Sequence, residues 1–396
     1  MMYDSYPSAV STQNGLPLGP GSKATSTAIL SMQRIANFGS FLQAYCLRDL
    51  VNQVQPDGQV QFADFHPAEM ANSTAQAPHT KMAYVKSAFR SGIRLTDTAR
   101  FASHKALYSR RYLPLLGISG NNYAPAVDLQ IIGSDEVFNC LQTTRSTGYV
   151  PELFGAGHRA SKLVSYAASF GNTTYKGLVD SGLADKVAQA LLEFDHLSVR
   201  DNHSQQLVER LTGLRPEVHV DPVLASPVTE VLLQRPSPSK GKRPYVISYA
   251  YPFRFSREEN QSIRRFADSI GAKVVCIGGL QQECDKYINC SPLDVLGLFA
   301  GAAAVATDTF HGTIFAVLAS KPFATLVRES SGGRYGNAEK LDHLLATLGL
   351  ASRRADAESV THILASEPDF SMARHRLSQE RNRTASYLRT VLSNDA

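Results

Sequence analysis

The chain has 396 residues, of which 43% are hydrophobic and 19% are charged, and its formal net charge is +5. This length suits two domains better than one core, and the composition is typical of a globular protein and excludes a chain that is disordered as a whole. Without long Lys/Arg blocks or basic strips interleaved with aromatics, nucleic acid is not an expected partner, whereas the mild positive charge suits an anionic ligand, an anionic membrane surface or a solvated protein surface.

Residues 1–26 are rich in Ser, Thr, Gly and Pro and lack an apolar core, which predicts a disordered tail rather than a signal peptide. No apolar run reaches the roughly 18 residues that span a bilayer. We therefore expect a cytoplasmic protein that contacts at most the inner membrane face.

The five cysteines form no CxxC pair, and no His, Cys and carboxylate cluster has metal-ligand spacing, so neither a disulfide framework nor a metal site is expected.

The first α/β pattern begins at residue 27. A strand is predicted at 27–32, a helix at 41–51 and a second strand at 60–65, with the turn Asn37-Phe38-Gly39-Ser40 before the helix. This β-α-β order indicates a parallel sheet with helices on its faces. Further strands and helices continue the pattern and predict an N-terminal α/β domain over residues 27–233.

A polar segment at residues 67–125 interrupts this pattern. It predicts a helical insert, with helical stretches around 82–89 and 97–108. Its basic side chains suit either the lining of a cleft, an anionic lipid surface or a solvated helix face; they are Lys81, Lys86, Arg90, Arg94, Arg100, Lys105, Arg110 and Arg111.

Residues 234–244 have the Pro, Ser and Lys-rich composition of a linker, and the α/β rhythm then restarts. A C-terminal α/β domain that ends in helices is predicted over residues 245–396. The expected fold is therefore two doubly wound Rossmann-like domains that face each other across a cleft. In such sheets, ligands bind beyond the carboxyl ends of the strands.

The loop Thr307-Asp308-Thr309-Phe310-His311-Gly312-Thr313 carries the strongest chemical signal. It places a histidine and small polar groups at the start of an apolar helix, where free N–H groups favour a phosphate or a carboxylate. His311 suits general acid/base catalysis near neutral pH, and Asp308 suits a helix cap or a partner that orients the imidazole. The same residues also suit a buried structural histidine.

Three other loops follow predicted strands. Gly133-Ser134-Asp135-Glu136 offers a close backbone approach and a carboxylate for a sugar hydroxyl, Ser169 lies among small residues, and Arg200 suits bidentate binding of a phosphate or carboxylate. Each loop also suits a structural role as a strand-end turn or an internal ion pair. The chain contains no GxxxxGK[ST], GxSxG or complete GxGxxG motif, so P-loop, serine-hydrolase and NAD-binding functions lack support.

Taken in order, six segments resemble the polysaccharide pyruvyl transferase family, from about residue 27 to about residue 350. They are Asn37-Phe38-Gly39-Ser40-Phe41-Leu42-Gln43-Ala44-Tyr45, Ile132-Gly133-Ser134-Asp135-Glu136-Val137-Phe138-Asn139, Ser165-Tyr166-Ala167-Ala168-Ser169-Phe170-Gly171, Leu197-Ser198-Val199-Arg200-Asp201, Val220-Asp221-Pro222-Val223-Leu224, and Thr307-Asp308-Thr309-Phe310-His311-Gly312-Thr313-Ile314-Phe315.

The resemblance implies a fold similar to two-domain glycosyltransferases of the GT-B type. It also implies transfer of the carboxyvinyl unit of phosphoenolpyruvate, as a ketal, onto hydroxyls of a sugar in a surface polysaccharide or its lipid-linked precursor. Phosphoenolpyruvate is then the donor substrate, and no cofactor is expected. His311 matches the family's acid/base. The residues expected to bind substrate are Arg200, Asn37, Gly39, Gly133, Ser134, Asp135, Ser169, Thr309, Gly312, Thr313, Arg328 and Arg334.

The sequence departs from the family pattern at Thr309, where several members carry a basic residue two positions before the histidine. Arg328 or Arg334 is expected to replace that charge, unless the donor differs. Glu136 and Phe138 also stand where many relatives have Gln and Trp, which bears on the choice of acceptor. The alternatives are a glycosyltransferase that uses a nucleotide sugar, and a non-catalytic member of a polysaccharide assembly complex.

Overall fold

The computed structural model describes residues 25–67, 92–142, 148–239, 241, 243–328 and 336–393. Residues 1–24 of the predicted tail, the stretch at 82–89 and the side chains of Lys81, Lys86, Arg90 and Arg334 lie outside the described residues. Within the described ranges, no helix combines the length and the apolar character that crossing a membrane requires.

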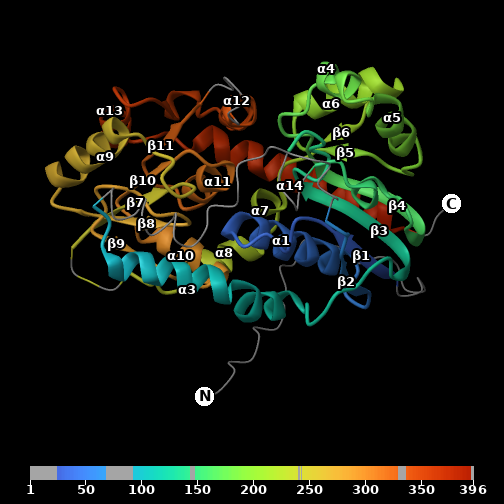
Figure 1. Cartoon of the computed structure of the whole chain (residues 1–396), viewed down its shortest axis with the longest axis horizontal. Helices are drawn as coiled ribbons and strands as arrows, with labels where there is room; N and C mark the ends of the chain where they lie inside the picture. The colour runs from blue at the N-terminus through green and yellow to red at the C-terminus, as the bar shows by residue number, and fades with distance from the viewer. Residues whose placement is uncertain are drawn as a thin grey trace.

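Two six-stranded sheets form the centres of the two halves of the molecule (Figure 1). The first sheet has the order β2-β1-β3-β4-β5-β6 and the second β12-β11-β10-β7-β8-β9, and neighbouring strands pair in parallel throughout. The predicted fold class of two doubly wound domains is confirmed. The strands are β1 (Ser26–Leu30), β2 (Gln59–Ala63), β3 (Ala126–Asp135), β4 (Arg159–Ala168), β5 (Ser198–Val199), β6 (Glu217–Val218), β7 (Tyr245–Tyr249), β8 (Lys273–Ile277), β9 (Lys286–Tyr287), β10 (Ala304–Thr307), β11 (Phe323–Leu326) and β12 (Arg354–Ala355).

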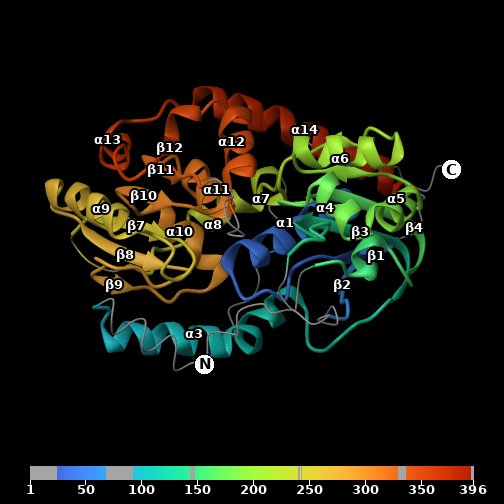
Figure 2. The same ribbon diagram turned by 45° about the horizontal axis from the view of Figure 1, so that its top comes forward.

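Helices connect the strands and cover the faces of both sheets (Figure 2). The α-helices of the first half are α1 (Phe38–Val54), α3 (Leu95–Tyr112), α4 (Tyr175–Asp180), α5 (Ala184–Leu192), α6 (Asn202–Thr212), α7 (Pro222–Ala225) and α8 (Val228–Leu233). Those of the second half are α9 (Arg257–Ser269), α10 (Val295–Ala300), α11 (Phe310–Leu318), α12 (Ala338–Thr347), α13 (Val360–Ala365) and α14 (Ser371–Leu392). Short 3-10 helices complete the set: η1 (Leu113–Leu116), η2 (Pro151–Phe154), η3 (Pro292–Asp294) and η4 (Ala351–Arg353).

One hydrophobic core runs through both halves. Phe41 of α1 and Phe315 of α11 are fully buried in the same cluster, which also contains apolar residues of α7, α10 and α14. Most of α1 is buried for this reason, since it packs between the first sheet and the second half of the chain. The shared core fixes the N-terminal end of α1, whose N-cap is Asn37, against the second half.

The last helix, α14, returns to the first half of the molecule. The hydroxyl of Tyr387 donates to the carbonyl oxygen of Ser165 at 2.7 Å, and the hydroxyls of Tyr166 and Thr384 lie 3.0 Å apart. The predicted division at residues 234–244 assigned this helix to the second domain by its place in the chain, but α14 packs across both halves (Figure 2).

Helix α3 also contacts both halves. It belongs to the predicted insert between the second and third strands, yet Phe101 packs edge-on against Tyr287 of β9 and the hydroxyl of Tyr112 donates to the carbonyl oxygen of Cys290 at 3.3 Å. Figure 1 shows α3 running along one side of the molecule beneath β9, α8 and α1. Helix α3 of the insert therefore connects the two halves, and we call it the strap helix.

Candidate active site

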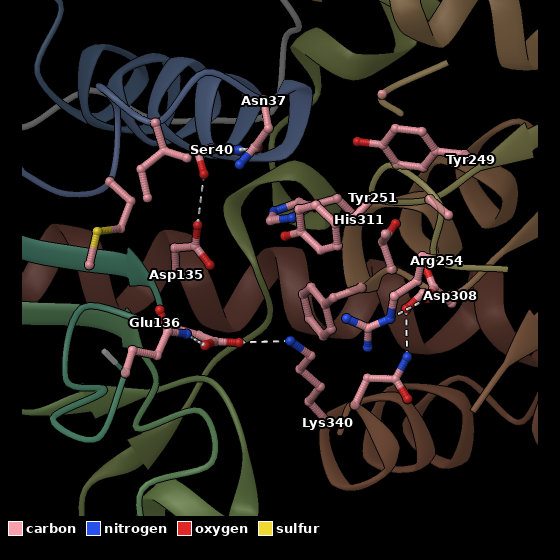
Figure 3. A pocket seen from close by; sticks show the side chains of 18 of the residues that line it. Asn37, Ser40, Asp135, Glu136, Tyr249, Tyr251, Arg254, Asp308, His311 and Lys340 are labelled. Atoms are coloured by element: carbon pink, nitrogen blue, oxygen red, sulfur yellow. Dashed lines mark hydrogen bonds and ion pairs between the residues drawn. The ribbon is translucent and has the colours of Figure 1, made fainter. Parts of the chain in front are cut away.

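A cavity of about 360 Å³ opens between the two halves, at the carboxyl ends of β1, β3, β7 and β10. This is where parallel sheets place their ligands, and the volume lies within the range of small-molecule sites. Figure 3 shows His311 near the centre, Asp135 and Glu136 on one side, and Arg254 and Asp308 on the other. Both sheets therefore contribute polar groups to one site.

His311 lies in the first turn of α11. The helix begins at Phe310 and has Thr309 as its N-cap, whose side-chain oxygen accepts a hydrogen bond from the Gly312 N–H at 2.9 Å. The Nε2 atom of His311 lies 3.5 Å from Oδ2 of Asp221, a fully buried carboxylate. Burial raises the pKa of Asp221, but the charges of His311 and Arg200 and a backbone N–H outweigh that effect and leave this pKa below its usual value. Asp221 is thus held as a carboxylate beside the imidazole.

Asp308 does not play either of the parts predicted for it. Thr309 is the cap, because its extended backbone directs its oxygen to the helix N-terminus, and Asp221 is the carboxylate nearest to His311. Asp308 instead points to the basic side chains of the second half, with Oδ2 3.0 Å from Nε of Arg254 and 3.2 Å from Nε of Arg328. Its carboxylate fixes two guanidinium groups.

Arg200 is almost completely buried at the cavity wall. Its Nη1 atom lies 3.4 Å from Asp135 and 3.3 Å from Asp221, and its guanidinium stacks 4.2 Å from the ring centroid of Phe310. Nearby carboxylates raise the pKa of Arg200 although burial lowers it. Among the described residues, its Nε atom has no hydrogen-bond partner. Arg200 therefore forms ion pairs with two carboxylates, while its Nε–H group has no acceptor among the described residues.

An ion pair joins the two halves across the cavity. Lys340 of α12 contacts Oε1 of Glu136 at 2.7 Å, while Oε2 of Glu136 accepts hydrogen bonds from Asn139 and Gln142. Asp135 lies beside this pair and accepts a hydrogen bond from the Ser40 hydroxyl at 3.2 Å. The end of β3 and the residue that follows it thus present two carboxylates, Asp135 and Glu136, to the cavity (Figure 3).

The residues predicted to bind substrate divide into two groups. Those that line the cavity are Asn37, Asp135, Arg200 and Thr309, together with His311 and Asp308. Those that do not line it are Gly39, Gly133, Ser134, Ser169, Gly312, Thr313 and Arg328.

The side chains of the second group have partners inside the protein. The Ser134 hydroxyl donates to Gln43, Ser169 donates to Asp201, and Arg328 contacts Glu259 at 2.8 Å as well as Asp308. Gly133 and Gly312 leave no room for a side chain, since a Cβ there would lie 2.2 Å from the Tyr166 carbonyl oxygen and 2.1 Å from the Thr307 hydroxyl, respectively. These residues therefore do not face the cavity; they lie behind the residues that line it.

Sequence reasoning assigned no site role to Tyr249, Tyr251, Arg254, Asn337 and Lys340, all of which line the cavity. Tyr249 ends β7, and Tyr251 and Arg254 follow it, so the rule that ligands gather at strand ends applies to all three. Lys105 also lines the cavity, which is one of the roles that the sequence leaves open for the basic side chains of the insert. Asp221 stood in a family-like segment but received no role.

The described residues contain no group of three or more His, Cys, Asp and Glu side chains arranged to hold a metal ion. Two parallel-sheet domains with a cavity between them define a two-domain α/β protein, and ligand sites occur preferentially at such domain interfaces. The chain belongs to the polysaccharide pyruvyl transferase family, whose model matches residues 37–330. A comparison with curated proteins found no match.

Several solved structures are similar along nearly their whole length. UDP-GlcNAc 2-epimerase from Neisseria meningitidis, bound to UDP-GlcNAc, is 9% identical, with 93% of this chain and 99% of that chain covered and a TM-score of 0.45. A putative UDP-N-acetylglucosamine 2-epimerase from Listeria monocytogenes is 10% identical, with 92% and 91% covered and a TM-score of 0.43. The glycosyltransferase SnogD from Streptomyces nogalater is 12% identical, with 93% and 99% covered and a TM-score of 0.40.

Proposed function

We propose that this transferase moves the carboxyvinyl unit of phosphoenolpyruvate onto two hydroxyls of a sugar, with His311 as the general acid/base. The observation that carries the proposal is the position of His311 in a family member, in the cavity between the sheets and beside the Asp221 carboxylate. The acceptor is a sugar of a surface polysaccharide or of its lipid-linked precursor, met at the cytoplasmic face of the membrane. Because the donor carries its own leaving group, the reaction uses no cofactor.

The imidazolium of His311 first gives its proton to the methylene carbon of phosphoenolpyruvate, which becomes a methyl group. The adjacent carbon becomes an oxocarbenium-like centre that one sugar hydroxyl attacks, and the proton of that hydroxyl returns to His311. The bond to phosphate then breaks. The second hydroxyl closes the ketal and its proton leaves with the phosphate, so that one ketal and one hydrogen phosphate are formed.

The charges of the cavity suit both substrates. The Asp221 carboxylate lies 3.5 Å from Nε2 of His311, the residue that gives up a proton in the first step. Arg200 and Arg254 place positive charge near the donor's phosphate and carboxylate, where fixed charges stabilise the transition state. Asp135 and Glu136, on the opposite side, provide carboxylate oxygens that accept hydrogen bonds from sugar hydroxyls.

The test is release of phosphate from phosphoenolpyruvate in the presence of a panel of aryl hexosides, with UDP-sugars and GDP-sugars as competing donors. Phosphate release that depends on both phosphoenolpyruvate and a hexoside supports the proposal. The departure at Thr309 motivates the competing donors: thermal stabilisation by a nucleotide sugar, without stabilisation by phosphoenolpyruvate, would indicate a glycosyltransferase instead. Absence of turnover with any donor, together with tight membrane or partner binding that is lost on deletion of residues 67–125, would support the non-catalytic alternative.

Gly39 gives a first structural prediction for this mechanism. A Cβ at this position would lie 2.2 Å from Nδ1 and 2.4 Å from Cγ of His311, so Gly39→Ala displaces the imidazole or the start of α1. Because a displacement of about 1 Å can cost a hundredfold in rate, we expect phosphate release to fall by about that factor. The control is Gly120→Ala, where a Cβ meets no atom within 4 Å. Equal activity of Gly39→Ala and the wild type would contradict the assigned position of His311.

A further inference from the structure

Lys105 lies on the cavity side of the strap helix α3. It lines the same cavity as His311, and its ammonium lies 5.9 Å from the ring centroid of Phe101, one turn earlier in the helix. The ammonium donates a hydrogen bond to the carbonyl oxygen of Ala36, just before the start of α1. The insert therefore places the positively charged ammonium of Lys105 where the two halves meet.

The other cationic side chains of the cavity are paired with carboxylates. Arg200 contacts Asp135 and Asp221, Arg254 contacts Asp308, and Lys340 contacts Glu136. Among the residues that the structure describes, Lys105 has no carboxylate within ion-pair distance, and its one hydrogen-bond acceptor is a neutral carbonyl oxygen. Its charge is thus the least compensated at the site, and an anionic ligand group is the partner that such a charge favours.

The segment around Lys105 is held firmly on both sides. The hydroxyl of Tyr108 donates to the carbonyl oxygen of Asn37 at 2.7 Å, which ties α3 to the start of α1. On the other side, a ring nitrogen of His104 contacts the side-chain oxygen of Asn289 in the second half. Because of this two-sided attachment, the position of Lys105 is set before any ligand arrives, which lowers the entropic cost of using it.

We propose that Lys105 binds an anionic group of the donor and so supplies the positive charge that the family pattern provides two residues before His311, where this chain has Thr309. The inference rests on phosphoenolpyruvate being the donor. Burial lowers the pKa of Lys105 to about 8, in keeping with an ammonium that is partly removed from water and still charged at neutral pH. Arg328, one of the two residues expected from the sequence to replace that charge, is engaged by Glu259 and Asp308 and does not line the cavity, and the other, Arg334, lies outside the described residues.

The experiment measures the dissociation constant of phosphoenolpyruvate by calorimetry at pH 7 for the wild type, Lys105→Met and Lys105→Arg. Met keeps the apolar stem and removes the charge, so we expect binding to weaken about ten- to a hundredfold, the usual loss for a hydrogen bond to a charged group. Arg keeps the charge and is expected to retain most of the affinity. In turnover, Lys105→Met should raise KM for the donor and leave KM for the hexoside unchanged.

Arg110→Met is the matched control, since it removes the same charge from an exposed position of the same helix. If Lys105→Met does not fold, Lys105→Gln replaces it, because Gln retains a donor for the Ala36 carbonyl but not the charge. If the wild type binds phosphoenolpyruvate and the uncharged variant binds it with the same affinity, the inference about Lys105 is wrong. The proposed function is not affected by that result. Absence of phosphoenolpyruvate binding by the wild type overturns both.

Discussion

His311→Gln is expected to lower the rate of phosphate release from phosphoenolpyruvate by about 10²- to 10⁴-fold, the usual contribution of a positioned general acid. Gln preserves some of the size and polarity of the imidazole but cannot give up a proton near neutral pH. The dissociation constant of phosphoenolpyruvate should change little, because the proposed role of His311 is proton transfer. The measurements are steady-state kinetics with the best hexoside of the panel and calorimetry with the donor alone.

His362→Gln serves as the control for this variant, since His362 is an exposed residue of α13 that does not line the cavity. Undiminished turnover in His311→Gln would show that His311 is not the general acid/base. Loss of donor binding together with turnover would show instead that the imidazole holds the donor, and the proton would have to come from elsewhere.

Asp308→Ala is expected to lower the free energy of unfolding by about 2 kcal/mol. The side chain of Asp308 is fully buried and forms ion pairs with Arg254 and Arg328, and removal of one partner from a buried ion pair is destabilising. Both arginines are about a quarter exposed and Arg328 retains Glu259, so water offsets part of the loss. Urea denaturation at pH 7 measures the effect.

The control is Asp342→Ala, which breaks an exposed ion pair with Arg354 and should cost no more than about 1 kcal/mol. Asp308→Ala should also weaken phosphoenolpyruvate binding, because Arg254 loses the carboxylate that fixes it at the cavity wall. A stability equal to that of Asp342→Ala would mean that the Asp308 cluster contributes no more than a surface pair.

The sequence predicted the fold and the main loops of the site for one physical reason. Strands, helices and turns recur in an order that only a parallel sheet satisfies, and the carboxyl ends of such strands meet at one edge. Asp135, Arg200 and His311 follow different strands and lie at the same cavity. The loop after β7, which carries Arg254, obeys the same rule and was overlooked.

Other features of the site depend on packing that no local pattern reveals. Lys105 reaches the cavity because α3 contacts residues 287–290 of the second half, almost two hundred positions along the chain. Ser134 and Ser169 belong to segments that the sequence predicts as substrate-binding loops, but Ser134 lies within β3 and both hydroxyls donate hydrogen bonds to neighbouring side chains. Asp308 and Thr309 are both good capping residues, and only the backbone conformation decides that Thr309 is the cap.

The most direct test is a crystal structure of the chain soaked with phosphoenolpyruvate. We expect one donor molecule in the cavity between the sheets, with its methylene carbon about 3–3.5 Å from a ring nitrogen of His311, the separation of groups poised to react. An anionic oxygen of the donor should contact the ammonium of Lys105. An empty cavity at saturating donor, or a donor bound with its methylene carbon turned away from His311, would contradict the proposed function.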